Sequence, residues 1–351
     1  MKQQLLFTNE VDRALQSWCA EHTYDKLFVL CDTNTANCVL PRLQASCLKE
    51  AQIITIEAGD MYKKLETLWS VWQFLSEKEA SRKSLLINVG GGMVTDLGGL
   101  AAATFKRGFP FINLPTTLLG AVDAAVGGKT GINFNGLKNE IGAFASAEAV
   151  IISTCFFTTL SEKELLSGYA EMLKHGLLDN LETYNTLLNY DIITCEVETL
   201  LPLLRQSVYI KERIVTDDPC EQGIRKALNL GHTFGHAFES FAMCHNTPIP
   251  HGYAVAWGLV CELLLSHRLF GFPTDIIYDF ASYIDRYYGG YAITCDDYEA
   301  LYYYMTHDKK NAGGNICFSL LRQIGQPVVD CHVEKPEIEI VFDIYRDLFH
   351  L

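Results

Sequence analysis

The sequence predicts an α/β protein with two domains: an N-terminal doubly wound, mostly parallel sheet of the Rossmann-like kind, and an all-α C-terminal domain. The chain has 351 residues, which exceeds a usual single core, and 49% of them are apolar. In the first half, apolar strand patterns alternate with helical patterns, which predicts a parallel sheet covered on both faces. From residue 161 helical patterns predominate. We therefore expect domains at 1–160 and 161–351, with the active site in the cleft between them.

Five strands and three helices are expected in the N-terminal domain. The expected strands are residues 26–30, 52–57, 84–89, 111–114 and 147–152, and the expected helices are residues 41–51, 62–77 and 97–104. Residues 115–144 are rich in glycine and polar groups, which is typical of a functional loop. Because ligands of doubly wound sheets bind at the carboxyl ends of the strands, the residues that follow each strand are candidates for a site.

Three glycines, at residues 90–92, follow the third expected strand and open a helix of small residues. Backbone amides there can approach a pyrophosphate without side-chain hindrance, aided by the positive end of the helix. The stretch is not the G-x-G-x-x-G fingerprint, so a tight strand-to-helix turn is the alternative. Asp32 and Asp60, at two further strand ends, are candidates to accept ribose hydroxyls, although aspartate after a strand is commonly a turn or cap residue.

Charge and cysteine usage restrict the partners and the compartment. The formal net charge of −14 argues against nucleic acid or an anionic membrane surface as a main partner, since both favour a basic face. The twelve cysteines include no C-x-x-C pair and follow no secretory leader, which indicates reduced thiols in the cytoplasm. No segment contains roughly 18 to 20 uncharged apolar residues, so no membrane span is expected.

His232 and His236 are four residues apart in a helix-compatible segment, so their imidazoles are expected on one helical face. Two neutral imidazoles are half of a metal site, which a carboxylate or a third histidine would complete. A pair of packed core histidines is the alternative that the spacing leaves open. Glu171 and Lys174 are also one turn apart, where a solvated ion pair is the ordinary explanation.

The sequence GGKT at residues 127–130 is similar to the end of a P-loop, but the first glycine of that pattern would stand at Asp123. The pattern therefore excludes a nucleoside-triphosphate site of this kind. Lys129 and Lys138 lie near glycines and can bind a phosphate or carboxylate as point charges, unless they are ordinary solvated lysines.

The motifs taken together resemble those of the 3-dehydroquinate synthase family, within the sugar-phosphate cyclases. The first half contains GGGMVTDL at 90–97, FKRG at 105–108, PTTLL at 115–119 and VDAAVGGKT at 122–130. The second half contains KN at 138–139 with IGAF at 141–144, GYAEMLK at 168–174, RKALNLGHTFGH at 225–236 and HGYAV at 251–255. The motifs follow in the family's order over roughly residues 26 to 320, and they are specific jointly rather than singly.

The resemblance implies a catalytic zinc, replaceable by cobalt, and a bound NAD. The implied metal ligands are Glu171, His232 and His251, which leaves His236 for another role. The implied NAD site consists of Asp32, Asp60 and Lys63 around the adenosine, Gly91 and Gly92 at the pyrophosphate, and Asp96, Thr116 and Thr117 near the nicotinamide, together with Lys129 and Lys138. Asp60 departs from the family, which usually has glutamate there, so its contact with ribose is shorter in reach.

The implied substrate is 3-deoxy-D-arabino-heptulosonate 7-phosphate, a small sugar phosphate that the family converts to 3-dehydroquinate and phosphate. This reaction belongs to the shikimate pathway, which leads to chorismate and the aromatic amino acids. By resemblance the substrate pocket contains Asp123, Lys129, Asn139, Lys174, Lys211, Arg225, Asn229, His236 and Lys309 or Lys310. Arg107 is implied to reach a phosphate across the interface of a homodimer.

The implied chemistry is a transient oxidation. Zinc polarises the C4 and C5 hydroxyls, hydride passes from C5 to NAD, and the resulting ketone acidifies the C6 proton so that phosphate can leave. Return of the hydride, ring opening and an aldol closure then give the product. His236 is expected to transfer a proton, helped by Glu221, because histidine has an ordinary pKa of about 6.5. Lys129 and Arg107 are the other expected catalytic residues.

Three alternatives are weighed against this function. A cyclase of secondary metabolism, making valiolone or an aminoshikimate precursor, is disfavoured by the intact residues 127–130 with Arg225 and Asn229. A metal-dependent polyol dehydrogenase of similar fold would release NADH, whereas the synthase releases phosphate with no net redox change. A non-catalytic metal-binding or regulatory protein is disfavoured by the complete polar pocket.

Overall fold

The computed structural model describes residues 3–135, 137–306 and 316–351, which form two compact units. Unit 1 comprises Met1–Ser161 and Thr194–Val208, and unit 2 comprises Glu162–Ile193 and Tyr209–Leu351. The chain thus returns to unit 1 through the first half of a helix whose second half belongs to unit 2. The predicted domains at 1–160 and 161–351 did not include this return, because helical periodicity does not indicate which core each half of a helix packs against.

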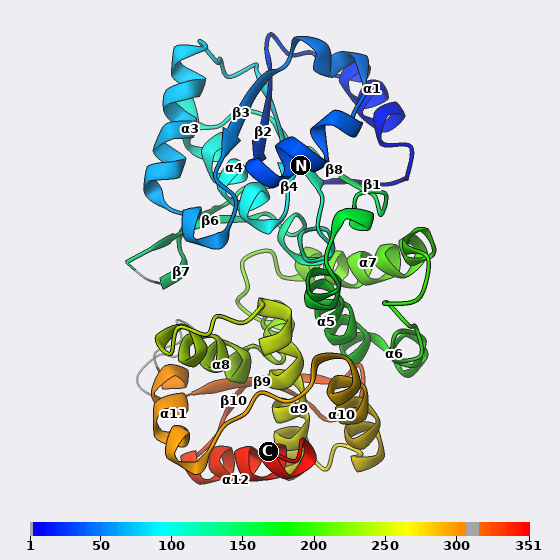
Figure 1. Ribbon diagram of the computed structural model, residues 1–351, viewed down its shortest axis with the longest axis vertical. Helices are drawn as coiled ribbons and strands as arrows, with labels where there is room; N and C mark the ends of the chain where they lie inside the picture. Colours follow the sequence, from blue (N-terminus) through cyan, green and yellow to red (C-terminus); the bar gives the residue numbers. More distant parts are fainter. Residues whose placement is uncertain (1–2, 136, 307–315) are drawn as a thin grey trace. The chain divides into compact units, whose positions relative to one another are not determined.

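In the described part of unit 1, six strands form one parallel sheet in the order β1-β8-β5-β4-β2-β3 (Figure 1). The strands are β1 (Gln4–Phe7), β2 (Leu27–Asp32), β3 (Gln52–Ile56), β4 (Leu85–Gly90), β5 (Phe111–Pro115) and β8 (Ala149–Ile152). The helices are α1 (Val11–Glu21), α2 (Thr33–Cys38), α3 (Leu65–Glu77) and α4 (Gly92–Thr104). The doubly wound, Rossmann-like prediction is confirmed.

The central strands are buried along their whole length because helices cover both faces of the sheet. Every residue of β2 and β4 is buried. On one face, α1 packs against alternate strand residues such as Val29, Ile87 and Ile112. On the other face α4 approaches closely, since a Cβ at Gly98 would lie only 2.0 Å from Asn88 Oδ1. The beginning of α4, at Gly92, follows the end of β4, at Gly90, after a single residue.

Several N-terminal elements differ from the sequence expectations. Strand β1 has no strong apolar pattern and was not predicted, yet it forms the edge beyond β8. The expected helix at 41–51 is instead two 3₁₀ helices, Leu40–Arg42 and Ser46–Glu50. The expected loop at 115–144 contains a π-helix, Gly120–Ala124, and an antiparallel hairpin of β6 (Lys129–Phe134) and β7 (Leu137–Phe144). Its glycines concealed the strands, since glycine is rare within strand patterns.

Unit 2 is mainly helical and is built around α9 (His251–Phe270), most of which is buried. The other helices are α5 (Glu162–Asp179), α6 (Leu181–Leu188), the second half of α7 (Leu201–Asp217), α8 (His232–Cys244), α10 (Thr274–Tyr288), α11 (Tyr298–Thr306) and α12 (Lys335–Leu348). Helices α5, α8, α10 and α12 all contact α9. His232 at the start of α8 and His251 at the start of α9 both lie close to Glu171 of α5.

Unit 2 also contains an antiparallel hairpin of β9 (Cys317–Leu321) and β10 (Pro327–His332), so the domain is not purely α-helical as predicted. Helix α9 is long and apolar enough to cross a membrane by length and composition, and 72% of its most apolar window is buried within the protein. A helix buried by its neighbours has the same composition as a membrane span. Here α9 forms the core of unit 2.

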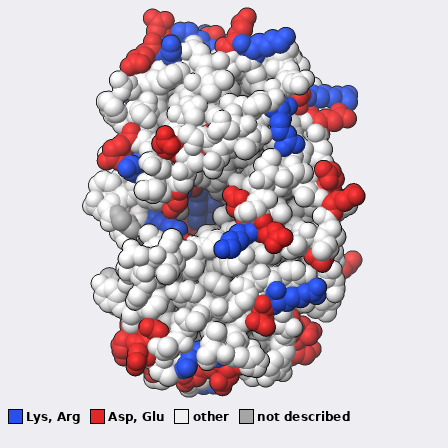
Figure 2. All heavy atoms as spheres, in the orientation of Figure 1, with Lys and Arg blue, Asp and Glu red and all other residues white. Residues whose placement is uncertain are grey.

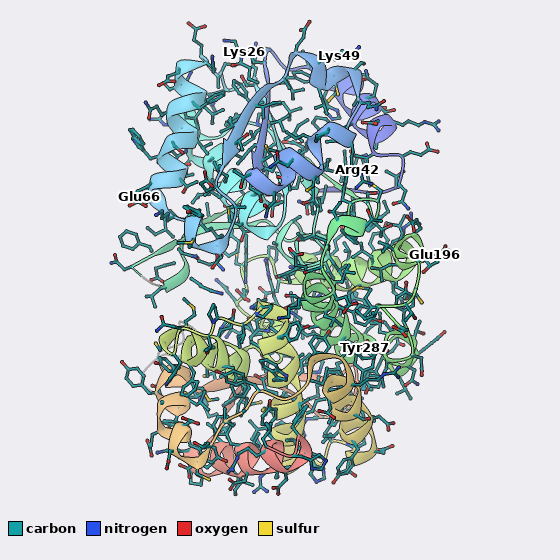
Figure 3. The ribbon with its side chains drawn as sticks, viewed as in Figure 1. Lys26, Arg42, Lys49, Glu66, Glu196 and Tyr287 are labelled. Atoms are coloured by element: carbon teal, nitrogen blue, oxygen red, sulfur yellow. The ribbon has the colours of Figure 1, made fainter. Side chains whose placement is uncertain are left out.

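Charged side chains lie mostly on the outside. On the face shown in Figure 2, lysines and arginines are scattered among carboxylates rather than gathered into a broad basic region. Figure 3 shows polar side chains such as Lys49 and Glu66 projecting from unit 1, where both are exposed. The buried charged residues are therefore exceptions, and those described in unit 2 include Glu171, Lys174 and Glu239.

Candidate functional site

In unit 2, three predicted metal ligands lie close together: one fully buried carboxylate and two imidazoles. Glu171 Oε1 lies 3.4 Å from His232 Nε2 and 3.5 Å from His251 Nε2. Ligand atoms of the three residues all lie within 4.8 Å of one another. Glu171 comes from α5, His232 begins α8 and His251 begins α9, so three helices each contribute one residue.

The outer nitrogen of each histidine ring has an acceptor that orients the ring. His232 Nδ1 is 3.1 Å from the carbonyl oxygen of Leu230, and His251 Nδ1 is 3.1 Å from Glu239 Oε2. Because a carbonyl and a carboxylate only accept, each Nδ1 carries the proton that is donated. Both Nε2 atoms face Glu171. In metal-binding histidines, one ring nitrogen donates to such an acceptor and the other is the ligand atom.

The buried carboxylate of Glu171 gives the site a charge that favours a bound cation. Lys174 forms a buried ion pair with one carboxylate oxygen of Glu171, and both imidazoles lie within 3.5 Å of the other. Burial alone would raise the pKa of Glu171, yet Lys174, His232 and His251 hold that pKa well below its ordinary value of 4.5. A fully buried carboxylate that faces two imidazoles fits zinc or cobalt.

His251 shows the same preference for positive charge. Burial alone would lower its pKa, but the carboxylates of Glu239 and Glu171 raise the pKa of His251 to about 10 from the ordinary 6.5. Without a metal, His251 is therefore an imidazolium between two carboxylates. A cation that binds here displaces the Nε2 proton, since a metal-binding imidazole must be deprotonated at its ligand atom.

Two glycines allow α9 to approach its neighbours closely enough to place His251. A Cβ at Gly252 would lie 1.8 Å from the carbonyl oxygen of Ser167 on α5, and the Gly252 amide donates to the Ser167 hydroxyl at 3.0 Å. A Cβ at Gly258 would lie 2.0 Å from the carbonyl oxygen of Gly231, just before α8. The three ligand-bearing helices can therefore meet only with glycine at these two positions.

We expect Gly252→Ala to lower the free energy of unfolding by about 3 kcal/mol, the upper part of the usual range for overpacking, because its Cβ would meet backbone atoms. Leu269→Ala, at an exposed position of the same helix, is the control and is expected to change it by less than about 1 kcal/mol. Urea unfolding followed by circular dichroism measures both. A Gly252→Ala variant as stable as the parent would show that α5 and α9 can separate without loss.

Glu262, which the sequence analysis did not select, holds the beginning of α8. This fully buried carboxylate on α9 accepts hydrogen bonds from the amides of Gly231, at 2.6 Å, and Thr233, at 3.1 Å. Gly231 has a φ of +81°, a left-handed conformation that favours glycine. The backbone on both sides of His232 is thus fixed, and a negative charge at a helix N-terminus is favourable.

His236 lies one turn after His232, with ring centroids 5.4 Å apart. Ligand atoms of His236, Glu239 and His251 form a second set that lies within 4.8 Å. The two sets share His251. The first set is the better candidate for a metal because Glu171 is fully buried and faces the Nε2 atoms of both histidines, whereas Glu239 already accepts from His251 Nδ1.

A tight turn that precedes α8 in the chain carries Arg225. The carboxylate of Asp218 accepts hydrogen bonds from the amides of Gln222, Gly223 and Arg225 at 3.0, 2.6 and 3.1 Å. These backbone donors hold the pKa of Asp218 below its ordinary value. Arg225 is buried and donates to the carbonyl oxygen of Pro219 at 2.6 Å, so its guanidinium is fixed by the turn.

Asn229 and Glu221, also predicted site residues, are in contact. Asn229 Nδ2 donates to Glu221 Oε1 at 3.4 Å, and Glu221 has a φ of +59°, which is uncommon for a residue with a side chain. Lys211 on α7 is buried, as is Lys174. Unit 2 therefore contains several buried cationic side chains, which is rare unless they serve a charged ligand or are paired.

In unit 1, the predicted pyrophosphate position is a close turn between β4 and α4. Gly91 is the N-cap of α4, and a Cβ there would lie 3.1 Å from Thr117 Cγ2. The amide of Thr116 donates to the carbonyl oxygen of Gly90 at 3.0 Å. The predicted residues Gly91, Gly92, Thr116 and Thr117 thus lie together at the amino end of a 13-residue helix, where anions are favoured.

A buried lysine joins two other predicted residues of unit 1. Lys63 Nζ donates to Asp96 Oδ2 at 2.5 Å and also to Asn139 Oδ1. Asp60, which is exposed, accepts from Asn133 Nδ2 at 3.3 Å and lies 3.9 Å from Lys138 Nζ. Lys63, Asp96 and Asn139 therefore form one polar cluster, and Asp60 with Lys138 forms a second contact.

Asp32 has the role of a helix cap. Its Oδ1 accepts from the amide of Thr35 at 2.8 Å, and the Thr35 hydroxyl is bonded in return to the backbone of Asp32. This reciprocal cap is the ordinary explanation that the sequence left open for an aspartate after a strand. Such a cap orients the carboxylate at the carboxyl end of β2.

The remaining predicted residues lie in distinctive backbone segments or outside the described residues. Asp123 is part of the π-helix, a form frequent at functional sites, and Lys129 begins β6 and is exposed. Arg107 is exposed with a φ of +69°, next to Lys106 at +50°, and strain of this kind also clusters at functional sites. Lys309 and Lys310 lie outside the described residues.

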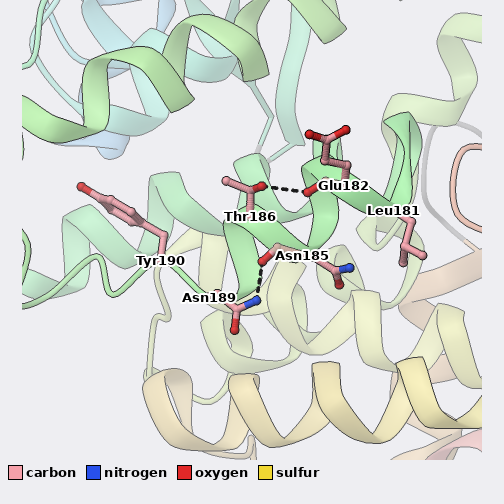
Figure 4. A pocket seen from close by; sticks show the side chains of 6 residues that line it. All are labelled: Leu181, Glu182, Asn185, Thr186, Asn189 and Tyr190. Atoms are coloured by element: carbon pink, nitrogen blue, oxygen red, sulfur yellow. Dashed lines mark hydrogen bonds between the residues drawn. The ribbon is translucent and has the colours of Figure 1, made fainter.

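A shallow hollow on the outer face of α6 is not a site of this chemistry. It is lined by Leu181, Glu182, Asn185, Thr186, Asn189 and Tyr190 (Figure 4). The Thr186 hydroxyl donates to the Glu182 carbonyl and Asn189 Nδ2 donates to the Asn185 carbonyl, each at 2.8 Å. These polar groups are therefore bonded to their own helix.

Comparison with known proteins shows the family of this chain. Residues 53–167 match the family described as 3-dehydroquinate synthase N-terminal, and residues 168–311 match that described as 3-dehydroquinate synthase C-terminal. A 3-dehydroquinate synthase of Parabacteroides distasonis is 50% identical over 349 residues, which cover 99% of each chain. The chain belongs to the 3-dehydroquinate synthase family.

Two solved structures share the fold of this family member. A 2-epi-5-epi-valiolone synthase from Streptomyces hygroscopicus, with NAD⁺ and Zn²⁺ bound, has a TM-score of 0.85 at 24% identity, covering 99% of this chain and 97% of that one. A 2-deoxy-scyllo-inosose synthase, complexed with carbaglucose-6-phosphate, NAD⁺ and Co²⁺, has a TM-score of 0.84 at 21% identity, covering 98% and 96%.

Three residues of this 3-dehydroquinate synthase family member support the site although sequence reasoning missed them: Glu239, Glu262 and Asp218. Glu239 had a usable signal, since it follows His232 by seven residues, two turns along the same helical face. Glu262 stands alone in the apolar pattern of α9, where a charged residue is rarely buried without a partner. Asp218 precedes a proline, a pattern that indicates a turn rather than a site.

Proposed function

We propose that this protein converts 3-deoxy-D-arabino-heptulosonate 7-phosphate into 3-dehydroquinate and phosphate, using NAD and a zinc or cobalt ion. The buried set of Glu171, His232 and His251, in a chain of this family, is the observation that carries the proposal. The name of the Parabacteroides distasonis relative supports the activity. The NAD⁺ with Zn²⁺ or Co²⁺ held by two proteins of the same fold supports the cofactors.

Glu171, His232 and His251 would hold the metal through one carboxylate oxygen and two Nε2 atoms. Three protein ligands leave coordination positions open, as catalytic zinc sites do. Zinc bound there would polarise hydroxyl groups of the substrate and so favour their deprotonation. Lys174, paired with Glu171, would orient that carboxylate and add positive charge beside it.

The glycine turn and the Lys63 cluster of unit 1 would hold NAD, which supplies a hydride acceptor that is restored within each turnover. Gly91 and Gly92 would face the pyrophosphate at the amino end of α4, since they carry no side chain to obstruct it. Lys63 fixes Asp96 and Asn139, so these two polar groups keep defined positions. Asp32, Asp60, Thr116, Thr117, Lys129 and Lys138 complete the proposed cofactor site.

Cationic side chains would bind the two acidic ends of the substrate. Lys211 and Arg225 are buried in a protein of net charge −14. These two cations would concentrate positive potential where a phosphate or carboxylate is bound. Asp123, Lys129, Asn139, Lys174, Asn229, His236 and one of Lys309 and Lys310 complete the proposed pocket. His236 would transfer a proton with the help of Glu221. We further propose a cytoplasmic homodimer in which Arg107 acts across the interface.

Phosphate release tests the proposal. Chelator-stripped protein is mixed with heptulosonate 7-phosphate, and zinc and NAD are added back separately and together. We expect phosphate only when both are present, with no accumulation of NADH, because the hydride returns to the intermediate. NADH accumulation without phosphate would indicate a polyol dehydrogenase, and no phosphate with both cofactors present would contradict the proposal.

A further inference from the structure

Glu239 contacts a candidate metal ligand, His251, at the ring nitrogen that does not face Glu171. This carboxylate lies on α8, is 5% exposed, and follows His232 by two helical turns. Its Oε2 lies 3.1 Å from His251 Nδ1. His251 Nε2 faces Glu171 at 3.5 Å, so the imidazole bridges two carboxylates that come from different helices.

The direction of the hydrogen bond decides what Glu239 does. An ionised carboxylate accepts only, so the proton stays on Nδ1 and Nε2 is the nitrogen available to a metal. We propose that Glu239 is a positioning residue that fixes the tautomer and the ring orientation of His251 for metal binding. This inference rests on the metal site of the proposed function and adds to it a residue that touches neither metal nor substrate.

The two histidine ligands differ in how they are held. His232 Nδ1 is bonded to the Leu230 carbonyl, a main-chain group only two residues away. The Nδ1 partner of His251, the first residue of α9, is instead the side chain of Glu239, which belongs to a different helix, α8. A substitution can therefore remove the support of His251 while leaving that of His232 in place.

A second role for Glu239 is chemically possible and makes a different prediction. Glu239 belongs to the set with His236 and His251, so it could itself be a ligand of a further cation. Glutamine distinguishes the two roles. Its amide oxygen still accepts from Nδ1, so positioning survives Glu239→Gln, whereas a neutral amide is a poor substitute for a carboxylate ligand of zinc.

Zinc titration of metal-free protein tests the proposal. The parent, Glu239→Gln, Glu239→Ala, Glu239→Met and Ser240→Ala are stripped with chelator, and zinc affinity and stoichiometry are measured by competition with a chromophoric chelator. We expect Glu239→Ala and Glu239→Met to bind zinc about 10–100-fold more weakly, the usual effect of removing such a partner. Glu239→Gln should stay within about 5-fold of the parent, since it keeps the acceptor. Ser240→Ala, the neighbouring control, should equal the parent.

Two further measurements separate positioning from a general loss of structure. Thermal unfolding of the metal-free variants reports folding, and Glu239→Met keeps most of the side-chain volume should Glu239→Ala fail to fold. The visible absorption of Co²⁺-loaded protein reports ligand geometry. We expect a changed spectrum for Glu239→Met and the parental spectrum for Glu239→Gln.

The outcomes are distinct. A parent that binds zinc, with Glu239→Met binding it equally well, would overturn this inference and leave the proposed function intact. A parent that binds two zinc ions, one of which is lost in Glu239→Gln, would overturn it in favour of a ligand role. A parent that binds no zinc would instead contradict the proposed function.

Discussion

Glu171→Gln is expected to weaken zinc binding by more than about 100-fold, because even partners outside the ligand set are worth 10–100-fold. Phosphate release from the heptulosonate substrate should fall at least as far. Glutamine keeps the size of the side chain but cannot supply the anionic oxygen that faces His232 and His251. Zinc affinity by chelator competition and phosphate release at saturating NAD measure the two effects.

The same substitution is expected to destabilise the metal-free protein. Glu171 and Lys174 are both buried, and removing one partner of a buried ion pair costs about 3–5 kcal/mol because the other charge remains without compensation. Glu171→Gln with Lys174→Met removes both charges and should recover part of that loss without recovering zinc binding. Glu162→Gln, exposed on the same helix, is the control for both measurements.

The pH dependence of this stability has a definite sign. Although burial alone would raise it, the pKa of Glu171 in the folded protein is held below its ordinary 4.5 by Lys174 and two histidines. Its contribution is therefore present above about pH 4.5 and is lost as the pH falls through the folded value. Urea unfolding from pH 7 to pH 3 measures this. A Glu171→Gln variant that binds zinc like the parent would contradict the ligand assignment.

Much of the doubly wound sheet could be predicted from sequence, because burial on both faces gives uninterrupted apolar runs. Strands β2 and β4 have this pattern and were predicted nearly in full. Strand β1 is half-exposed, so its four residues carry no comparable pattern. Strands β6 and β7 were interpreted as a loop because glycines interrupt them, although their pairing is regular from Lys129 to Ile132.

The candidate site shows a similar limit. Histidines one turn apart on a helix predict a shared face from local geometry, but the choice between His236 and His251 as a ligand depends on contacts between helices. Those contacts rest on the missing side chain of Gly252, which no periodicity reveals. Glu239 and Glu262 act through partners on other helices, so their roles become visible only when α8 and α9 are seen packed together.

His232→Ala and His236→Ala are expected to give different defects, although the two rings lie one turn apart on the same helix. His232→Ala should weaken zinc binding by more than about 100-fold and abolish phosphate release, because it removes one of two Nε2 ligand atoms facing Glu171. His236→Ala should bind zinc within a few-fold of the parent yet release phosphate about 10²–10⁴-fold more slowly, the usual contribution of a positioned proton-transfer group.

The comparison is informative because the protein offers two overlapping sets of ligand atoms, and only one contains His236. If the set of His236, Glu239 and His251 held the catalytic metal, His236→Ala would lose zinc and His232→Ala would keep it. If His236→Ala kept both zinc and the parental rate, His236 would have no catalytic role. The carboxylate of Glu171 favours the set with His232, since it is fully buried and a buried anion needs cationic partners, such as Lys174 or a metal ion, to compensate it.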